Sequence, residues 1–335
     1  MTDNSRIGSR HLVEQDLLDF IDKMTPITLS EELLPTLRAG FGARLELEED
    51  SKAVEMVETL RRTVPGPGDD PDVGIALHLP REAGVTRGAI LHIHGGGYVS
   101  GDAYAMIPGH RRLAMELDCI IVSVDYRLAP ETRFPGAVED CYAALAWLVG
   151  EADALGVDRS RIGVMGESAG GGLAASLALL ARDRGEYALA YQHLIYPMID
   201  DRTCVTEDSN PCAGEFVWTA ESNRFGWKCL LGTEPGGPDV SHYAAAARAP
   251  DLRGLPATFI NTGALDLFVD EDIAYAHRLI RAGIPTELHV YPGAYHGFHL
   301  VPDARTTQRA YCDSRDALLR ALGSEPVDAT GARSA

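Results

Sequence analysis

A serine flanked by glycines is the most direct pointer to chemistry in this sequence. Ser168 lies in the GESAG segment at 166–170, a match to G-x-S-x-G, between an apolar run at 161–165 and a small, apolar helical stretch. A strand, a sharp turn and a helix in this order hold a serine at the tip of a strained turn, where glycine alone fits comfortably two positions before and after it. We therefore predict that Ser168 is a nucleophile. The alternatives are a serine packed in a glycine-rich helix start and a phosphate-binding turn, but no G-K-[ST] accompanies the glycines.

Consecutive glycines follow another apolar run. His94 precedes Gly95, Gly96 and Gly97 directly after 91–93, at the carboxyl end of a predicted strand, where α/β sheets place their ligands. Such a loop turns backbone N–H groups toward a substrate oxygen with no Cβ in the way, and the N–H of Ala169 complements them. We expect an oxyanion hole here, with His94 bracing the loop by hydrogen bonding and not acting as a base. The alternative is a flexible glycine loop with an incidental histidine.

The acid and the base that would activate Ser168 are expected on late loops. In triads built on a strand, turn and helix of this kind, the acid and then the histidine follow the serine along the chain. Asp266 follows the apolar run 258–261, and His296 follows the run 287–291. His296 would accept the serine proton and later deliver it to the leaving group, while Asp266 would fix the imidazole tautomer.

Four neighbouring side chains are rival candidates for these two roles. Asp270 and Asp272 lie further from the strand end, and we expect them to supply charge to the first turn of the following helix. His289 lies inside a predicted strand, and His299 lies too far into the following segment. We therefore keep the two residues nearest the strand ends as the predicted acid and base.

Alternating apolar and amphipathic stretches predict the elements that position these residues. Short runs rich in Val, Ile and Leu predict buried strands at 73–79, 89–93, 119–124, 161–165, 189–195, 258–261 and 287–291. Helical patterns fall at 108–117, 136–150, 169–184, 270–282 and 303–322. This alternation predicts an α/β fold, in which a parallel sheet is wrapped by helices through crossover connections.

Two stretches depart from this rhythm. Residues 1–50, with a predicted helix at 10–24, and residues 200–235 would jointly form a helical lid over the sheet, or would simply add surface helices. The predicted division is an N-terminal helical cap segment at 1–50 and a catalytic domain at 51–323, to which about 200–235 adds part of the cap. A polar tail at 324–335 is expected to be disordered.

Composition and charge limit the classes of partner. The 335 residues include 30 basic and 49 acidic side chains, a net charge of −19, which repels phosphate, so we expect no nucleic-acid partner and no membrane partner. The six cysteines show no C-x-x-C pair and no metal-ligand spacing, so neither a disulfide scaffold nor a metal site is indicated. With no secretory signal and no transmembrane run, we expect a cytoplasmic protein.

A set of short motifs resembles the hormone-sensitive-lipase-like group of bacterial esterases, also called family IV. The motifs are HGGG at 94–97, DYRLAPE at 125–131 with FP at 134–135, GESAGG at 166–171, YPMID at 196–200, DLFVDE at 266–271 and HGF at 296–298. The resemblance spans about residues 65–320. The sequence departs from the family at Glu167, where Asp or Thr is more common, and at Leu267 and Phe268, which replace the usual Pro-Leu.

The resemblance implies an α/β-hydrolase with a mostly parallel, eight-stranded sheet and a helical cap. It implies hydrolysis of a small-molecule substrate, a short- to medium-chain carboxylic ester, through an acyl-enzyme and without a cofactor. It also implies that Gly96, Gly97 and Ala169 supply the oxyanion N–H groups, with His94, Gly95 and Glu167 in support. A homodimer formed through the edge of the last strand is left open.

Two alternative functions remain open. An amidase, formamidase or deacetylase would use the same residues on a poorer leaving group, and the sequence does not separate it from an esterase. Some plant hormone receptors resemble the same family, with the catalytic histidine replaced, and hold a small molecule without reaction. Because Ser168, Asp266 and His296 are all present, the sequence favours an enzyme over such a receptor.

Overall fold

The computed structural model of the chain describes residues 8–24, 28–40, 49–82 and 84–323. The strands are β1 Val57–Val64, β2 Val73–Pro80, β3 Arg87–Ile93, β4 Ile120–Asp125, β5 Val157–Glu167, β6 Tyr191–Ile195, β7 Ala257–Gly263 and β8 Thr286–Tyr291. The α-helices are α1 Gln15–Lys23, α2 Leu34–Ala39, α3 Ser51–Met56, α4 Ile107–Leu117, α5 Gly136–Gly150, α6 Ala152–Leu155, α7 Ala169–Arg184, α8 Ala220–Leu231, α9 Val269–Arg281 and α10 Arg305–Leu322. The tail predicted at 324–335 lies outside the described residues.

All these strands form one eight-stranded sheet in the order β1-β2-β4-β3-β5-β6-β7-β8. From β4 to β8 every neighbouring pair is parallel, whereas β2 is antiparallel to both β1 and β4. The expected fold class, a mostly parallel eight-stranded α/β sheet, is confirmed. The carboxyl ends of β3, β5, β7 and β8 therefore meet at one edge of the sheet, where the loops that follow them lie close together.

The sequence-based elements agree with the structure except at one edge, in α8 and in the short helices α2, α3 and α6. Each of the seven predicted strands lies on one of β2 to β8, but β1 was not predicted and its connection to β2 is not a crossover. The reason is the polar sequence of β1, VETLRRTV, which is largely accessible to solvent at the edge of the sheet. The helix α8 was also not assigned, although it lies within the stretch 200–235 that departs from the strand and helix rhythm.

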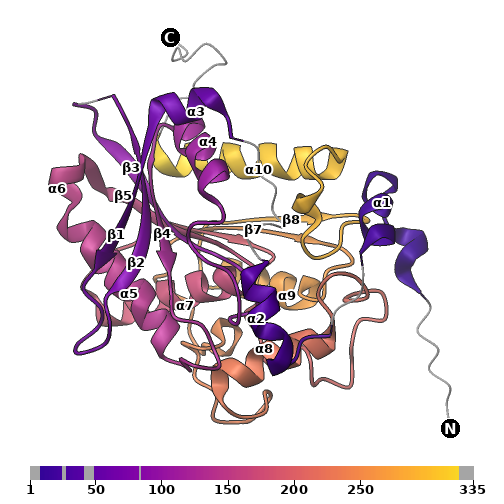
Figure 1. Ribbon diagram of the computed structural model, residues 1–335. Coiled ribbons are helices and arrows are strands. Elements are labelled where there is room, and N and C mark those ends of the chain that lie inside the picture. Colours follow the sequence, from indigo (N-terminus) through magenta and orange to yellow (C-terminus); the bar gives the residue numbers. More distant parts are fainter. Residues whose placement is uncertain (1–7, 25–27, 41–48, 83, 324–335) are drawn as a thin grey trace, which may run out of the picture.

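Helices cover both faces of the sheet (Figure 1). One face packs against α5, α7 and α9, and its core is the larger of the hydrophobic clusters. The other face packs against α4 and α10, with Ala114, Leu117, Leu318 and Leu322 in its core. Both faces of the central strands are thus buried, in agreement with their apolar sequences.

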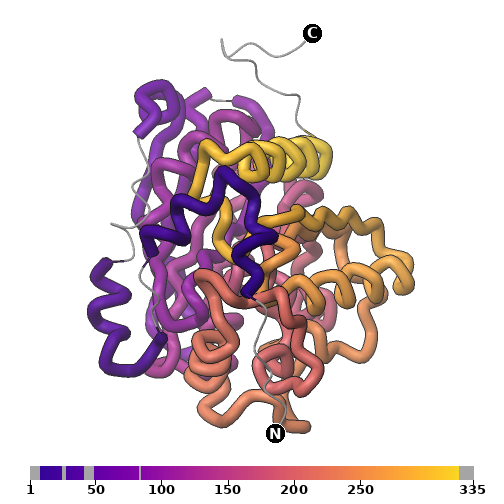
Figure 2. Tube along the Cα trace, turned by 90° about the vertical axis from the view of Figure 1, so that its right-hand side faces the viewer, coloured from indigo at the N-terminus to yellow at the C-terminus, as the bar shows by residue number. Residues whose placement is uncertain are grey.

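The N-terminal segment lies over the loops that follow the late strands. Figure 2 shows the indigo helix α1 between the yellow helix α10 and the orange stretch 200–235. Ser9 donates a hydrogen bond to Glu215 in that stretch, and Arg305 at the start of α10 pairs with Glu14. Further along, Leu34 of α2 packs in one cluster with residues of α8. Both stretches that depart from the strand and helix rhythm therefore contact one another.

Candidate active site

The turn between β5 and α7 holds Ser168 in a strained backbone conformation. Ser168 has φ 57° and ψ −122°, and a non-glycine residue with positive φ marks local strain. A Cβ at Gly166 would lie 2.3 Å from the carbonyl oxygen of Gly170, so the turn closes only with glycine there. The backbone N–H of Ser168 donates to Ile195 O, and Met198 N–H donates to Ser168 O, which fixes the turn against the end of β6.

The structure brings Ser168, His296 and Asp266 together in one hydrogen-bonded line. The Oγ of Ser168 lies 2.9 Å from Nε2 of His296, and Nδ1 of His296 lies 2.8 Å from Oδ2 of Asp266. The second carboxylate oxygen of Asp266 accepts the N–H of Phe268 at 3.0 Å. Asp266 is fully buried, whereas Ser168 and His296 keep 7% and 6% of their surface exposed. The nucleophile and the base are thus reachable, and the acid is not.

Aromatic rings hold the imidazole of His296 in this line. The ring of Tyr196 lies edge-on at 4.7 Å between centroids, and the ring of Phe268 lies perpendicular at 5.1 Å. Tyr196 itself is anchored by a hydrogen bond between its hydroxyl and the ring of His299. Because these contacts restrict the tilt of the imidazole, Nε2 stays directed at the serine hydroxyl.

The glycine loop after β3 lies directly against the turn that carries Ser168. A Cβ on Gly95 would lie 3.0 Å from the carbonyl oxygen of Glu167, and one on Gly170 would lie 2.1 Å from that of Ile93. Gly96 and Gly97 have φ 119° and 64°, which side chains rarely adopt. The loop and the first turn of α7 can therefore approach only because both contain glycine.

His94 is built into the base of this loop. Its Nδ1 lies 2.8 Å from the carbonyl oxygen of Gly95, and its ring stacks on Tyr126 at 4.2 Å. The hydroxyl of Tyr126 donates to the backbone oxygen of His94. Burial lowers the pKa of His94 to about 4, so the ring is neutral at physiological pH.

The rival residues lie elsewhere. Asp270 is exposed and accepts a hydrogen bond from Asn210, so it faces away from the imidazole of the candidate site. Asp272 is fully buried, and burial raises its pKa well above the usual range. Both Asp270 and Asp272 lie in the first turn of α9, as expected, and the raised pKa of Asp272 favours its neutral form there. His289 pairs with Glu287 on its own strand.

Three residues of the site were given no role from the sequence, although Tyr196 begins the YPMID motif. Trp218, in the stretch 200–235, covers Gly97 so closely that a Cβ there would lie 2.3 Å from its ring. Tyr196 and His92 contact His296 and Glu167, respectively. For His92 a signal existed, since a histidine interrupts the otherwise apolar run before the glycines. For Trp218, no sequence pattern nearby predicts a contact with a loop more than a hundred residues earlier in the chain.

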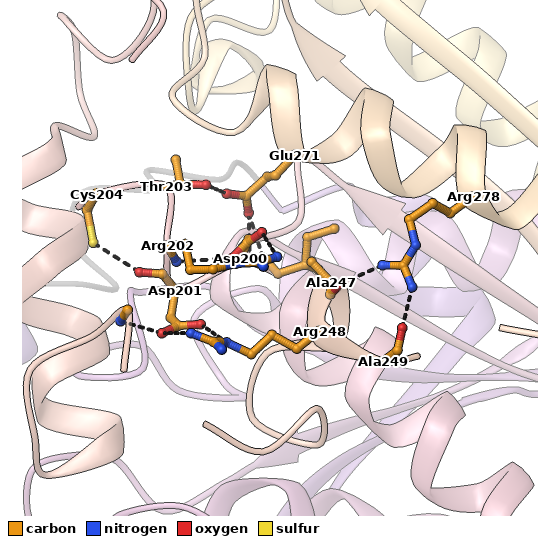
Figure 3. A network of polar contacts seen from close by, with 12 residues as sticks. Asp200, Asp201, Arg202, Thr203, Cys204, Ala247, Arg248, Ala249, Glu271 and Arg278 are labelled. Carbon is orange, nitrogen blue, oxygen red and sulfur yellow. Dashed lines mark hydrogen bonds and ion pairs between the residues drawn. The ribbon is translucent and has the colours of Figure 1, made fainter. Parts of the chain in front are cut away.

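A second buried polar network lies behind the acid loop (Figure 3). Glu271, in the first turn of α9, accepts the backbone N–H groups of Ile199 and Asp200 and the hydroxyl of Thr203. Asp201, fully buried, pairs with Arg248 at 2.6 Å. This network holds the chain where the stretch 200–235 begins.

Among the described residues, every helix is too short or too polar to span a membrane. No group of three or more His, Cys, Asp or Glu side chains in the part of the chain that the structure describes could hold a metal ion. The six cysteines, all within that part, form no disulfide.

Known proteins resemble the chain in sequence and structure. A family model described as the alpha/beta hydrolase fold matches residues 90–300. The chain is 35% identical over 264 residues to carboxylesterase NlhH of Mycobacterium tuberculosis, covering 76% of this chain and 81% of NlhH. It is 32% identical to an arylesterase of Saccharolobus solfataricus, covering 69% of this chain and 74% of that protein. The solved structure of a bacterial heroin esterase matches 94% of this chain and 99% of its own, with 38% identity and a TM-score of 0.86.

Proposed function

The chain belongs to the hormone-sensitive-lipase-like α/β hydrolases, and we propose that it is a serine carboxylic ester hydrolase whose catalytic triad is Ser168, His296 and Asp266. The observation that carries this proposal is the hydrogen-bonded line from the Ser168 hydroxyl through the His296 imidazole to the buried Asp266 carboxylate. Its three residues come from loops after β5, β8 and β7, at one edge of the sheet.

With these three residues, ester hydrolysis proceeds through two acyl-transfer steps. His296 accepts the proton of Ser168 as the oxygen attacks the ester carbonyl, and then delivers that proton to the departing alcohol. Water activated by His296 next attacks the acyl-enzyme and releases the acid. Asp266 keeps the proton on Nδ1 of the imidazole and stabilises its charged form.

The negative charge of the tetrahedral intermediate requires donors on the other side of the carbonyl carbon. We assign this role to the backbone N–H groups of Gly96, Gly97 and Ala169, supported by the contact of the glycine loop with the turn that carries Ser168. Ala169 begins the 16-residue helix α7, whose N-terminal end carries partial positive charge toward the same place.

The described parts of 1–50, together with 200–235, form the cap in this proposal. Support comes from Trp218, which covers Gly97, and from α8, where a Cβ on Gly226 would lie 2.6 Å from Gly97 O. A cap seated directly on the glycine loop leaves room for small substrates, so we propose short- to medium-chain esters. Free cysteines support a cytoplasmic location. The homodimer through the sheet edge stays a prediction.

Two measurements on the purified protein test the proposal. It should hydrolyse p-nitrophenyl butyrate, and an organophosphate should label Ser168 in a way that mass spectrometry of the digested protein localises. Comparing the butyrate ester with butyryl p-nitroanilide distinguishes an esterase from an amidase. A protein that turns over no activated ester and takes no label at Ser168 would reject the triad and favour a non-catalytic binder.

A further inference from the structure

A chain of buried hydrogen bonds lies beside the triad and takes no part in it. His92 on β3 is 1% exposed, and its Nε2 lies 2.9 Å from Oε2 of Glu167 at the end of β5. Its Nδ1 lies 2.9 Å from Oγ of Ser123 on β4, which is fully buried. Because both ring nitrogens are engaged, the imidazole is fixed in orientation between two neighbouring strands.

The link connects the two halves of the proposed machinery. His92 lies two residues before His94, where the glycine loop begins, and Glu167 directly precedes Ser168. The backbone pairing of β3 with β5 ends at Ile93 opposite Gly166. The side-chain bond therefore ties the two strands together just where the backbone ladder stops and the two functional loops begin.

Glu167 also lies beside the glycine loop. A Cβ on Gly95 would lie 3.5 Å from Cγ of Glu167 and 3.4 Å from Cβ of Ser168. The aliphatic part of Glu167 thus lies next to the loop, while its carboxylate is held by His92. A shift of this side chain would change the distance between the glycine loop and the nucleophile.

The carboxylate of Glu167 keeps its charge in these surroundings. Burial raises its pKa, but the adjacent His92, through its charge and its hydrogen bond, outweighs burial and leaves the pKa below its usual value. A buried pair of this kind is seldom more stabilising than apolar residues of the same shape, although breaking it is costly. Stability alone is therefore a poor explanation for placing it here.

We infer that Glu167 and His92 are positioning residues that fix the spacing between Ser168 and the glycines of the oxyanion hole. The inference rests on the proposed function, since it assigns both side chains to the same ester hydrolysis. Neither residue has to touch the substrate. They act through the loop and the turn, so their loss should weaken binding of the transition state more than binding of the substrate.

The test compares E167Q, H92Q and the double variant with the wild type on p-nitrophenyl butyrate. We expect each single variant to lower kcat about 10-fold with KM changed less than about 2-fold, the pattern of a lost transition-state interaction. Affinity for a butyl boronic acid, which mimics the tetrahedral intermediate, should fall by the same factor as kcat. The double variant should be no worse than either single variant, because both break one link.

His193 offers a matched control. It is also a 1% exposed histidine within a strand, level with His92 on the other side of β5, but its Nε2 lies 2.7 Å from Oγ of Ser314 on α10 and not against a neighbour of the nucleophile. H193Q should lower the melting temperature and leave kcat and boronic acid affinity at wild-type values. A merely structural role for Glu167 and His92 would give the same pattern in all three variants.

Two outcomes overturn the inference: E167Q and H92Q with wild-type kcat and boronic acid affinity, or a double variant whose losses simply add. Should E167Q fail to fold, H92Q carries the same test, because it breaks the same hydrogen bond from the other strand. Failure of the proposed function has a different signature, since the wild type would then neither hydrolyse the ester nor take an organophosphate at Ser168.

Discussion

Two aspartates in this molecule, Asp266 and Asp201, are alike in their burial and differ in their side-chain partners. Both are fully buried, and both accept a backbone N–H, from Phe268 and Gly236 respectively. The partner on the other side differs, since Asp266 meets an imidazole that can gain and lose a proton and Asp201 meets the guanidinium of Arg248, which stays charged. The partner of each aspartate, more than its burial, therefore distinguishes the candidate active site from a structural ion pair.

The two networks also differ in what they join. The line of Ser168, His296 and Asp266 joins the tips of three loops and leaves one end open to a substrate. The network in Figure 3 joins the chain after β6 to α9 and to the segment around Arg248. We therefore expect changes in the first network to lower turnover and changes in the second to lower stability.

The largest effect is expected at the open end of the triad. Replacing Ser168 by Ala removes the nucleophile, and kcat for p-nitrophenyl butyrate should fall by about 10⁶-fold, with residual rate from the oxyanion hole and binding alone. The midpoint of thermal unfolding should stay near that of the wild type, because alanine keeps the Cβ of serine and leaves the positive φ unchanged. A variant that keeps most of its turnover would remove Ser168 from the mechanism.

The next effect concerns the acid of the triad. Asp266→Asn should lower kcat by about 10⁴-fold, because the amide favours the wrong imidazole tautomer while keeping the shape. Asp270→Asn is the control, since Asp270 is exposed and contacts Asn210. The kcat of both variants is measured on the butyrate ester. A larger loss of kcat in the Asp270 variant would mean that Asp270, and not Asp266, is the acid of the triad.

The ion pair of the second network should respond in stability. Arg248→Ala leaves Asp201 buried without its charged partner, and the free energy of unfolding should fall by about 3–5 kcal/mol. The kcat of the protein that remains folded should stay within about 2-fold of the wild type, since no triad contact is lost.

A surface ion pair on the same segment supplies the comparison for Arg248. Arg202 pairs with Asp200 but keeps 51% of its side chain exposed, so Arg202→Ala should lower the free energy of unfolding by less than about 1 kcal/mol. Urea unfolding of both variants checks this difference. Equal losses in the two variants would contradict the role given to the buried pair.

Much of the fold followed from the sequence because the central strands are buried on both faces. The run 119–124 is apolar except for Ser123, whereas β1 carries charged side chains at the sheet edge and gives no such signal. The helix α8 stayed hidden for another reason. Half of its buried residues, Ser222, Asn223 and Gly226, are small or polar and interrupt the apolar stripe that would mark a buried helix.

That Ser168, His296 and Asp266 come together could be predicted because they follow the ends of strands, and the topology of a parallel sheet gathers such ends at one edge. The residues that surround it could not. His92 and Glu167 are 75 positions apart, and their contact depends on which strands pair and in what register. Local patterns carry no information on register between distant strands, so such contacts appear only in three dimensions.

Replacing an acid by its amide in each network, Asp266→Asn in the first and Glu271→Gln in the second, compares the two networks directly. Glu271→Gln should have the smallest effect on turnover and stability. Burial raises the pKa of Glu271 well above its usual range and so favours its neutral form, which a neutral amide of the same shape resembles. Its amide oxygen can still accept the N–H groups of Ile199 and Asp200. We expect unchanged kcat and a change in the free energy of unfolding of about 1 kcal/mol or less.

The pH dependence of Glu271→Gln then decides the protonation state. A carboxyl whose pKa is raised in the folded state contributes stability below its unfolded pKa and loses it as pH rises through the folded value. The wild type should therefore lose stability relative to Glu271→Gln as the pH of urea unfolding is raised, and the two should converge in acid. Parallel curves would show that folding does not raise the pKa of Glu271. A loss of turnover approaching that of Asp266→Asn would show that the candidate site requires a charged Glu271.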